Sequence, residues 1–184
     1  MKIASPDTDQ YWYQISAHTS ARNGRNGVSG APWPLQLHVA ALVGNEGIEA
    51  SATTFSGDAP STWSIAIVTA DARLVMVRMQ FDAEQYDLER DRETPEDEAA
   101  EITVSESWVR RLRDVVRLDV GKVRMRRGSF GRMMSDQLDV GKLSLTFRDG
   151  TVSDLEFDQV AMTTHDDRAQ SDQFMDALRK HTGL

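Results

Sequence analysis

The sequence predicts a mainly β protein with one C-terminal α-helix, and three neighbouring segments lead to this fold class. Lys142–Phe147 alternates apolar and polar side chains, which is typical of a strand with one buried face. A turn of Arg, Asp and Gly follows at 148–150, and Thr151–Phe157 runs back with the same alternation. Asp166–His181 then has the apolar spacing of an amphipathic helix. We therefore expect a strand pair followed by a closing helix.

The predicted helix has consistent signals at both ends. Charged residues that complement the helix dipole occupy its first and last turns, namely Asp166, Asp167, Arg179, Lys180 and His181. Phe174 and Leu178 lie four residues apart and form an inward stripe with Ala177. Gly183 suits a left-handed cap, so we expect the helix to end there.

Four strand-like segments precede this unit, at Leu35–Val43, Ile48–Phe55, Thr62–Thr69 and Arg73–Phe81. The first is predicted from the period-two spacing of Leu35, Leu37 and Val39. The last two are separated by only Ala-Asp-Ala, which is short enough for a hairpin. The cleaner apolar face of the last segment consists of Val75, Val77, Met79 and Phe81.

The middle of the chain is less regular. Asp82–Glu101 is strongly acidic and contains Pro95, which indicates a solvated loop. Trp108–Val116 fits both helical and strand spacing, and both interpretations stay open. Apolar residues then alternate as in a strand at Val116, Leu118 and Val120, with Val123 and Met125 as candidates to continue it.

A five-residue repeat marks the next region, because Leu118–Lys122 has the same sequence as Leu138–Lys142. A single short repeat does not indicate a solenoid. Neither Gly-Lys pair has the upstream glycine and the following Ser or Thr of a phosphate-binding loop. We therefore interpret both copies as strands that exit into turns.

The expected domain organisation is an N-terminal extension at 1–33 and a single domain at 34–184, with the acidic insertion at 82–101. The extension carries a Gly- and Asn-rich loop at Arg22–Gly30. Its aromatic cluster, Tyr11 to Tyr13, either starts a strand or docks on the main body. Pro32 and Pro34 make a stiff connection into the domain.

The order of about seven short antiparallel strands and a final helix resembles pleckstrin-homology-like domains, including the lipid-binding GRAM-type domains of bacteria. The similar segments are Val68–Leu74, Leu112–Val116, Leu143–Gly150 and Ser171–Leu178, within residues 33–184. The resemblance implies an antiparallel barrel or sandwich. It also implies binding of phospholipid headgroups or protein partners, or self-assembly, rather than catalysis.

The sequence departs from this pattern in two places. The acidic insertion at 82–101 replaces the usual short connection between strands. The first strand loop, 44–47, carries Glu46 where a headgroup-binding domain has a basic motif. No headgroup-binding residue is therefore carried over, and the departure lowers the case for lipid.

Composition excludes several kinds of site. Of the 184 residues, none is cysteine, so disulfides, thiolate metal sites and cysteine nucleophiles are excluded. The four histidines, His18, His38, His165 and His181, have no partner at metal-ligand spacing, and we expect neither metal nor cofactor. No apolar run reaches the roughly 20 residues of a membrane span, and no secretory signal is recognisable, so the expected location is cytoplasmic.

The charge distribution points to one candidate surface. The net charge of −8 argues against bulk binding to nucleic acid. Between Trp108 and Arg132, however, only Asp114 and Asp119 oppose a run of basic residues. The candidate ligand- or partner-binding residues are Lys122, Arg124, Arg126, Arg127 and Arg132. The first three share one face if this segment is a strand, and arginines of a glycine-containing loop are suited to phosphate or carboxylate. In the alternative interpretation this face pairs with the acidic insertion.

These observations favour a non-enzymatic cytoplasmic binding module that acts through protein–protein contacts or self-association. One alternative is a peripheral binder of anionic lipid or phosphate ligands through the basic 122–132 face. The other is an enzyme whose site is assembled only in space, since paired catalytic groups need not be close in sequence. The sequence nominates no catalytic residue.

Overall fold

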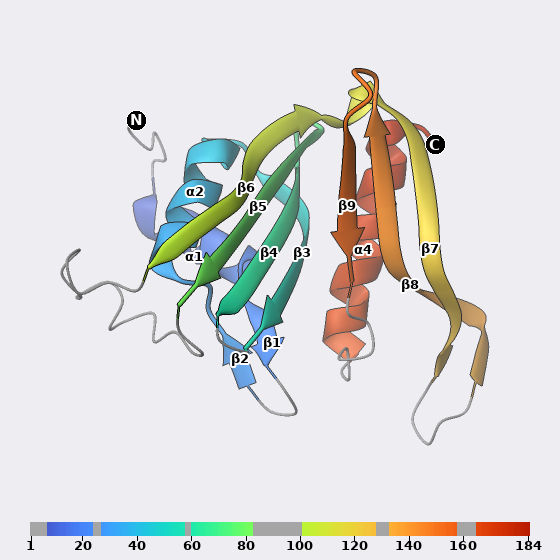
Figure 1. Ribbon diagram of the computed structural model, residues 1–184, viewed down its shortest axis with the longest axis horizontal. Helices are drawn as coiled ribbons and strands as arrows, with labels where there is room; N and C mark the ends of the chain where they lie inside the picture. Colours follow the sequence, from blue (N-terminus) through green and yellow to red (C-terminus); the bar gives the residue numbers. More distant parts are fainter. Residues whose placement is uncertain (1–6, 24–26, 58–59, 83–100, 128–132, 158–164) are drawn as a thin grey trace.

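The computed structural model describes residues 7–23, 27–57, 60–82, 101–127, 133–157 and 165–184. Two main antiparallel sheets form the centre of the fold (Figure 1). The first has the strand order β3 (Ile48–Ser56), β4 (Ser61–Thr69), β5 (Arg73–Phe81) and β6 (Ile102–Arg111). The second has the order β7 (Val115–Arg127), β8 (Met133–Phe147) and β9 (Val152–Glu156). A small hairpin pairs β1 (Ala21–Asn23) with β2 (Gly27–Ser29).

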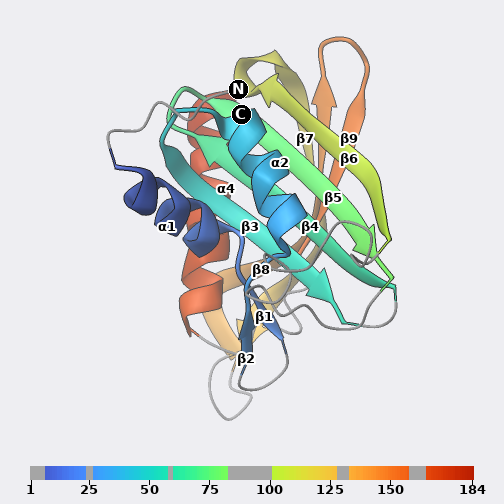
Figure 2. The ribbon, with the colours of Figure 1, turned by 90° about the vertical axis from the view of Figure 1, so that its left-hand side faces the viewer.

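Helices cover both faces of the first sheet. On one face lie α1 (Thr8–His18) and α2 (Trp33–Val43), as Figure 2 shows from that side. On the other face lies α4 (His165–Thr182), which shares a core with the second sheet. The fold therefore has three layers, and the first sheet is the middle one.

This middle position explains the burial of β5. Its predicted core face is confirmed, because Val75 and Val77 are fully buried against α1 and α2. Leu74 and Met76 on the opposite face are also fully buried, against α4 and the second sheet. A strand covered on both faces reads as a nearly continuous apolar run rather than a clean alternation.

The prediction of a strand at Leu35–Val43 is wrong, since this segment belongs to helix α2. Its apolar residues fit both periods, but the burial follows the helical one, with Leu35, Val39 and Val43 buried. Leu37, which a strand would bury beside Leu35, is 43% exposed. Pro34 in the first helical turn is the decisive local signal, because proline is compatible with that position.

The described part of the predicted N-terminal extension packs on the first sheet. Its aromatic cluster lies in helix α1 rather than in a strand, and Tyr11 and Ile15 enter the core beneath it. The Tyr11 hydroxyl donates to the carbonyls of Ala40 (3.2 Å) and Gly44 (2.9 Å), which ties α1 to the C-terminal end of α2. Burial raises the pKa of this phenol.

The ambiguous segment between the sheets contains both predicted structures in succession. It is strand β6 as far as Arg111, then a short 3₁₀ turn at Leu112–Asp114, then strand β7. Leu112 is fully buried in the core shared with α4. This turn moves the chain from the first sheet to the second, so it forms the junction between them (Figure 1).

The interpretation of the repeat as two turns is wrong. Gly121 and Gly141 lie inside β7 and β8, and the two copies meet only at their Gly-Lys ends, with Gly121 opposite Lys142. Lys122 has a positive φ of 53°. A Cβ on Gly141 would stand 2.9 Å from the Lys122 Cβ, so glycine is required here for close approach.

The closing helix is confirmed. Phe174 and Leu178 are fully buried between the sheets, and Gly183 follows with φ 71° as the left-handed cap. At its end, Lys180 Nζ and His181 Nε2 each lie 2.7 Å from the Glu49 carboxylate on β3. The hydrogen bonds from Lys180 and His181 lower the pKa of Glu49.

The fold class is thus mainly β with a C-terminal helix, and two further helices lie on the N-terminal side. The two main described sheets remain open rather than closing into a barrel. Within the described residues, none of the helices is both long enough and apolar enough to cross a membrane.

Candidate functional site

The predicted basic face lies on β7, and its described side chains are paired within the protein. Lys122 Nζ lies 3.6 Å from the Glu156 carboxylate on β9. Arg124 and Arg126 share a face, as predicted, because both approach Asp139 on β8. The side chain of Arg127 and the whole of Arg132 lie outside the described residues.

Arg126 is a structural residue. Its side chain is only 9% exposed, and its Nε donates to Asp139 at 2.8 Å. Its two terminal nitrogens donate to the two carboxylate oxygens of Asp172 on α4, at 3.0 and 2.8 Å. The hydrogen bonds that Arg126 donates to Asp172 hold the pKa of the guanidinium above its usual range, with Asp139 adding to the effect and burial opposing it. Arg126 therefore joins β7, β8 and α4.

This arrangement also answers part of the alternative interpretation. The basic face does pair with carboxylates, but the described partners are Asp139, Glu156 and Asp172. The acidic insertion proposed as its partner falls almost entirely outside the described residues.

A second surface lies on the part of the β7–β8 pair that extends beyond β9. Because β9 pairs only with Lys142–Thr146 of β8, the rest of the pair forms a two-stranded arm. Met125 pairs with Leu138, and these side chains are 50% and 57% exposed. Paired residues share a face of a sheet, so the arm carries an exposed apolar patch with Val123 beside it.

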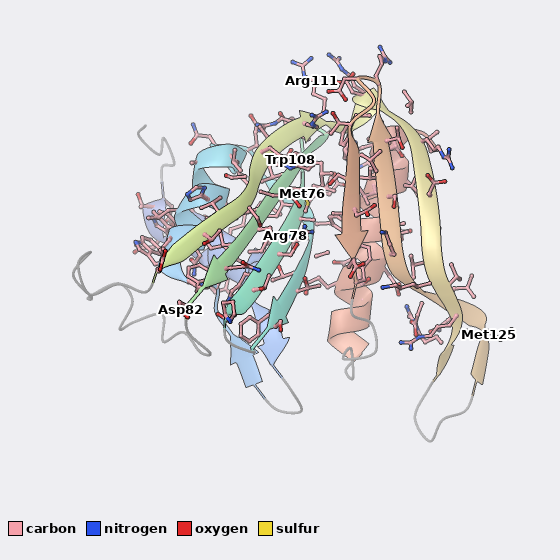
Figure 3. All side chains as sticks on the ribbon, in the orientation of Figure 1. Met76, Arg78, Asp82, Trp108, Arg111 and Met125 are labelled. Carbon is pink, nitrogen blue, oxygen red and sulfur yellow. The ribbon has the colours of Figure 1, made fainter. Side chains whose placement is uncertain are left out.

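A concave site lies at the junction of the two sheets, near the labelled Arg111 in Figure 3. It is a cleft of about 620 Å³ between the end of β6, the 3₁₀ turn and the β8–β9 turn. Its lining residues are Val109, Arg110, Arg111, Asp114, Phe147, Arg148 and Asp149. We call this site the arginine cleft.

Arg110 is fixed in the wall of the arginine cleft. Its guanidinium carbon lies 4.8 Å from the centre of the Phe147 ring and 5.8 Å from that of Trp108. One terminal nitrogen donates to Asp149 at 2.8 Å, and the other donates to the Thr151 hydroxyl at 3.2 Å. The aromatic faces and the carboxylate together hold this cation in one orientation.

Asp149 is fully engaged in the same cluster. Hydrogen bonds from the backbone and hydroxyl of Thr151, followed by that from Arg110, lower its pKa to about 2. The carboxylate is therefore ionised at neutral pH, and its charge is balanced by Arg110.

The other two arginines of the cleft differ from Arg110. Arg111 and Arg148 are exposed, and neither forms an ion pair with a carboxylate among the described residues. Asp114 is the remaining acid of the lining. With Arg110 and Asp149 cancelling, two arginines face one aspartate, and the cleft carries a net positive charge suited to an anionic group.

Sequence reasoning missed this site although it noticed its parts. The basic run includes Arg110 and Arg111, and Arg148 and Asp149 belong to the predicted turn. These residues are almost 40 positions apart, and only the crossover from one sheet to the other brings them together. Within the described part of the chain, no group of three or more acidic or histidine side chains is placed to hold a metal ion.

Comparisons with known proteins add no further assignment. No family model, curated protein or solved structure matches this chain.

Proposed function

We propose that this protein is a non-enzymatic binding module and that the arginine cleft is where it holds a partner protein. The observation that carries the proposal is the pair of cleft arginines, Arg111 and Arg148, which form no ion pair with a described carboxylate and outnumber the remaining acid, Asp114. Arginine is well suited to such contacts because its planar fork matches a carboxylate in two hydrogen bonds.

The composition of the cleft favours binding over catalysis. Its lining combines three arginines and two aspartates with the apolar Val109 and Phe147. Exposed arginines beside an exposed apolar side chain are typical of protein–protein contact sites. The pleckstrin-homology-like resemblance implies the same general role. Membership of that family is part of what we propose.

The lipid alternative has less support. It relied on the 122–132 face, where Lys122, Arg124 and Arg126 are paired with carboxylates of the same chain. A headgroup binding there would have to displace these pairs. The cleft arginines need no such displacement, so we place the binding role in the cleft.

A site-specific crosslinking experiment tests the proposal. A photoreactive amino acid replaces Val109, which lines the cleft, and the full chain is irradiated in its native cells. We expect a protein adduct that disappears in the Arg111→Ala/Arg148→Ala background. An adduct of twice the chain mass would identify the partner as a second copy.

The matched control carries the photoreactive residue at Val152, an exposed position on β9 outside the cleft lining. Adducts common to both positions are nonspecific. If the Val109 position gives no protein adduct of its own, or if its adducts are unaffected by the arginine substitutions, the proposed function is wrong.

A further inference from the structure

The arginine cleft lies beside an open strand edge. In the described sheet β6 pairs with β5 on one side only. Leu112 N–H donates to Ala72 O at 2.9 Å, which fixes the alternation of hydrogen bonds along this pair. The residue opposite Arg73 is Arg111, so Arg111 occupies a position whose N–H and C=O point away from β5. The same holds for Val109, two residues earlier.

These backbone groups give the cleft a row of hydrogen-bond donors and acceptors along the strand edge. Val109 and Arg111 each present a donor and an acceptor at the spacing of alternate strand residues, and both residues line the cleft. A strand added at this edge would satisfy both kinds of group. A phosphate or another simple anion could accept from the N–H groups, but it would leave the carbonyls without a donor.

The side chains around the edge define what such a strand should carry. Arg111 and Arg148 favour carboxylates, because neither forms an ion pair with a described carboxylate. Val109, which is 37% exposed, supplies apolar contact beside the charges. Val109 and Arg111 are two residues apart and share a face of β6, so alternating acidic and apolar residues would set the carboxylates of an added strand together on the face of Arg111.

We propose that the partner's contacting segment is an extended acidic peptide that adds a strand to β6 within the arginine cleft. This inference rests on the proposed function and names the chemistry of its partner. The peptide backbone bonds to Val109 and Arg111, and the peptide carboxylates bind Arg111 and Arg148. Strand addition of this kind draws affinity from the backbone and specificity from the neighbouring side chains.

The test uses the full chain and a blocked, fluorescently labelled hexapeptide of alternating Val and Glu. Fluorescence anisotropy is measured at about 0.15 M salt, where weak surface attraction is screened. We expect saturable binding to the wild-type protein. Replacing Glu by Gln should weaken binding about tenfold or more, and so should methylating alternate backbone nitrogens of the acidic peptide.

Protein variants locate the site. Arg111→Ala/Arg148→Ala should abolish binding of the acidic peptide, with circular dichroism confirming that the fold is retained. Arg117→Ala is the matched control, because Arg117 is a highly exposed arginine on β7 outside the cleft. This control should bind as the wild type does.

The outcomes separate this inference from the proposed function. Equal binding of the N-methylated peptide, or displacement by inorganic phosphate as effective as by unlabelled peptide, overturns strand addition and leaves a simple anion site. Failure of the acidic peptide to bind, together with arginine-dependent crosslinks from position 109, overturns the inference alone. Failure of both experiments overturns the function as well.

Discussion

The two arginine-containing regions of this protein differ in how their charges are paired. On the β7–β8 arm, Arg126 is buried between Asp139 and Asp172 and holds three elements together. In the arginine cleft, Arg111 and Arg148 are exposed without a described carboxylate partner. Figure 3 shows the two regions well apart, with the labelled Arg111 at the top and the labelled Met125 at the lower right. A run of basic residues in the sequence therefore suggests a binding surface only where folding does not bring acidic side chains next to it.

The largest expected loss of stability comes from a substitution in α4, the helix that carries Asp172. Phe174→Ala should lower the free energy of unfolding by about 3–5 kcal/mol, because Phe174 is fully buried between the sheets and its loss leaves a cavity. Urea melts measure this. Asp176→Ala, on the exposed side of α4, should change stability by less than about 0.5 kcal/mol. Equal effects of the two substitutions would show that α4 does not pack as described.

Arg126→Ala should be the next most destabilising, by about 3 kcal/mol in urea melts, because it leaves the buried Asp139 without its main partner. Arg124→Ala is the control on the same face. Arg124 is half-exposed and lies 3.5 Å from Asp139, so its loss should cost less than about 1 kcal/mol. If Arg126→Ala is as mild as Arg124→Ala, the contrast between a structural arm and a binding cleft disappears.

The two repeat glycines, Gly121 and Gly141, test how closely β7 and β8 approach each other. Gly141→Ala should destabilise the protein by about 1–3 kcal/mol, because its Cβ would stand 2.9 Å from the Lys122 Cβ. Gly121→Ala, at the equivalent repeat position, meets Lys142 Cβ at an ordinary 3.6 Å and should be neutral or slightly stabilising. Thermal or urea melts of the two variants compare the positions directly. A reversed order would contradict the described approach of Gly141 to Lys122.

The pKa of Asp149 tests the balanced pair inside the cleft. Arg110→Ala should raise it above about 2, yet keep it below the usual value of about 3.9, because the hydrogen bonds from Thr151 remain. A carboxyl-detected NMR titration measures both values. Since folding lowers this pKa, Asp149 contributes stability above about pH 4, and the contribution is lost as the pH falls towards 2. An unchanged pKa in the variant would exclude the Arg110 contact.

The smallest expected effect on stability belongs to the cleft arginines. Arg111→Ala/Arg148→Ala should change the free energy of unfolding by less than about 0.5 kcal/mol, since neither side chain has an ion-pair partner among the described residues. The same variant should lose peptide binding. A large loss of stability in urea melts would instead show that these arginines are structural, like Arg126.

Local signals were sufficient where neighbouring residues make the structure. The β4–β5 hairpin, the β8–β9 pair and helix α4 were predicted because their periods, short turns and charged ends all agree. The strand prediction for Leu35–Val43 was wrong because the apolar spacing of this segment fits both the strand and the helical period. Packing against the first sheet selects the helix. The interpretation of the repeat was wrong because the local sequence around a glycine does not distinguish a strand interior from a turn.

The sequence by itself determined the β-rich composition, the closing helix and the presence of many arginines between Trp108 and Arg132. Only the tertiary structure decided which of those arginines are neutralised. Asp139 and Asp172 reach Arg126 because β8 and α4 fold over it, whereas the sheet crossover leaves Arg111 beside a strand edge that is unpaired within the described residues. The physical reason is that ion pairing depends on distances of a few ångströms in space, and these residues are far apart along the chain.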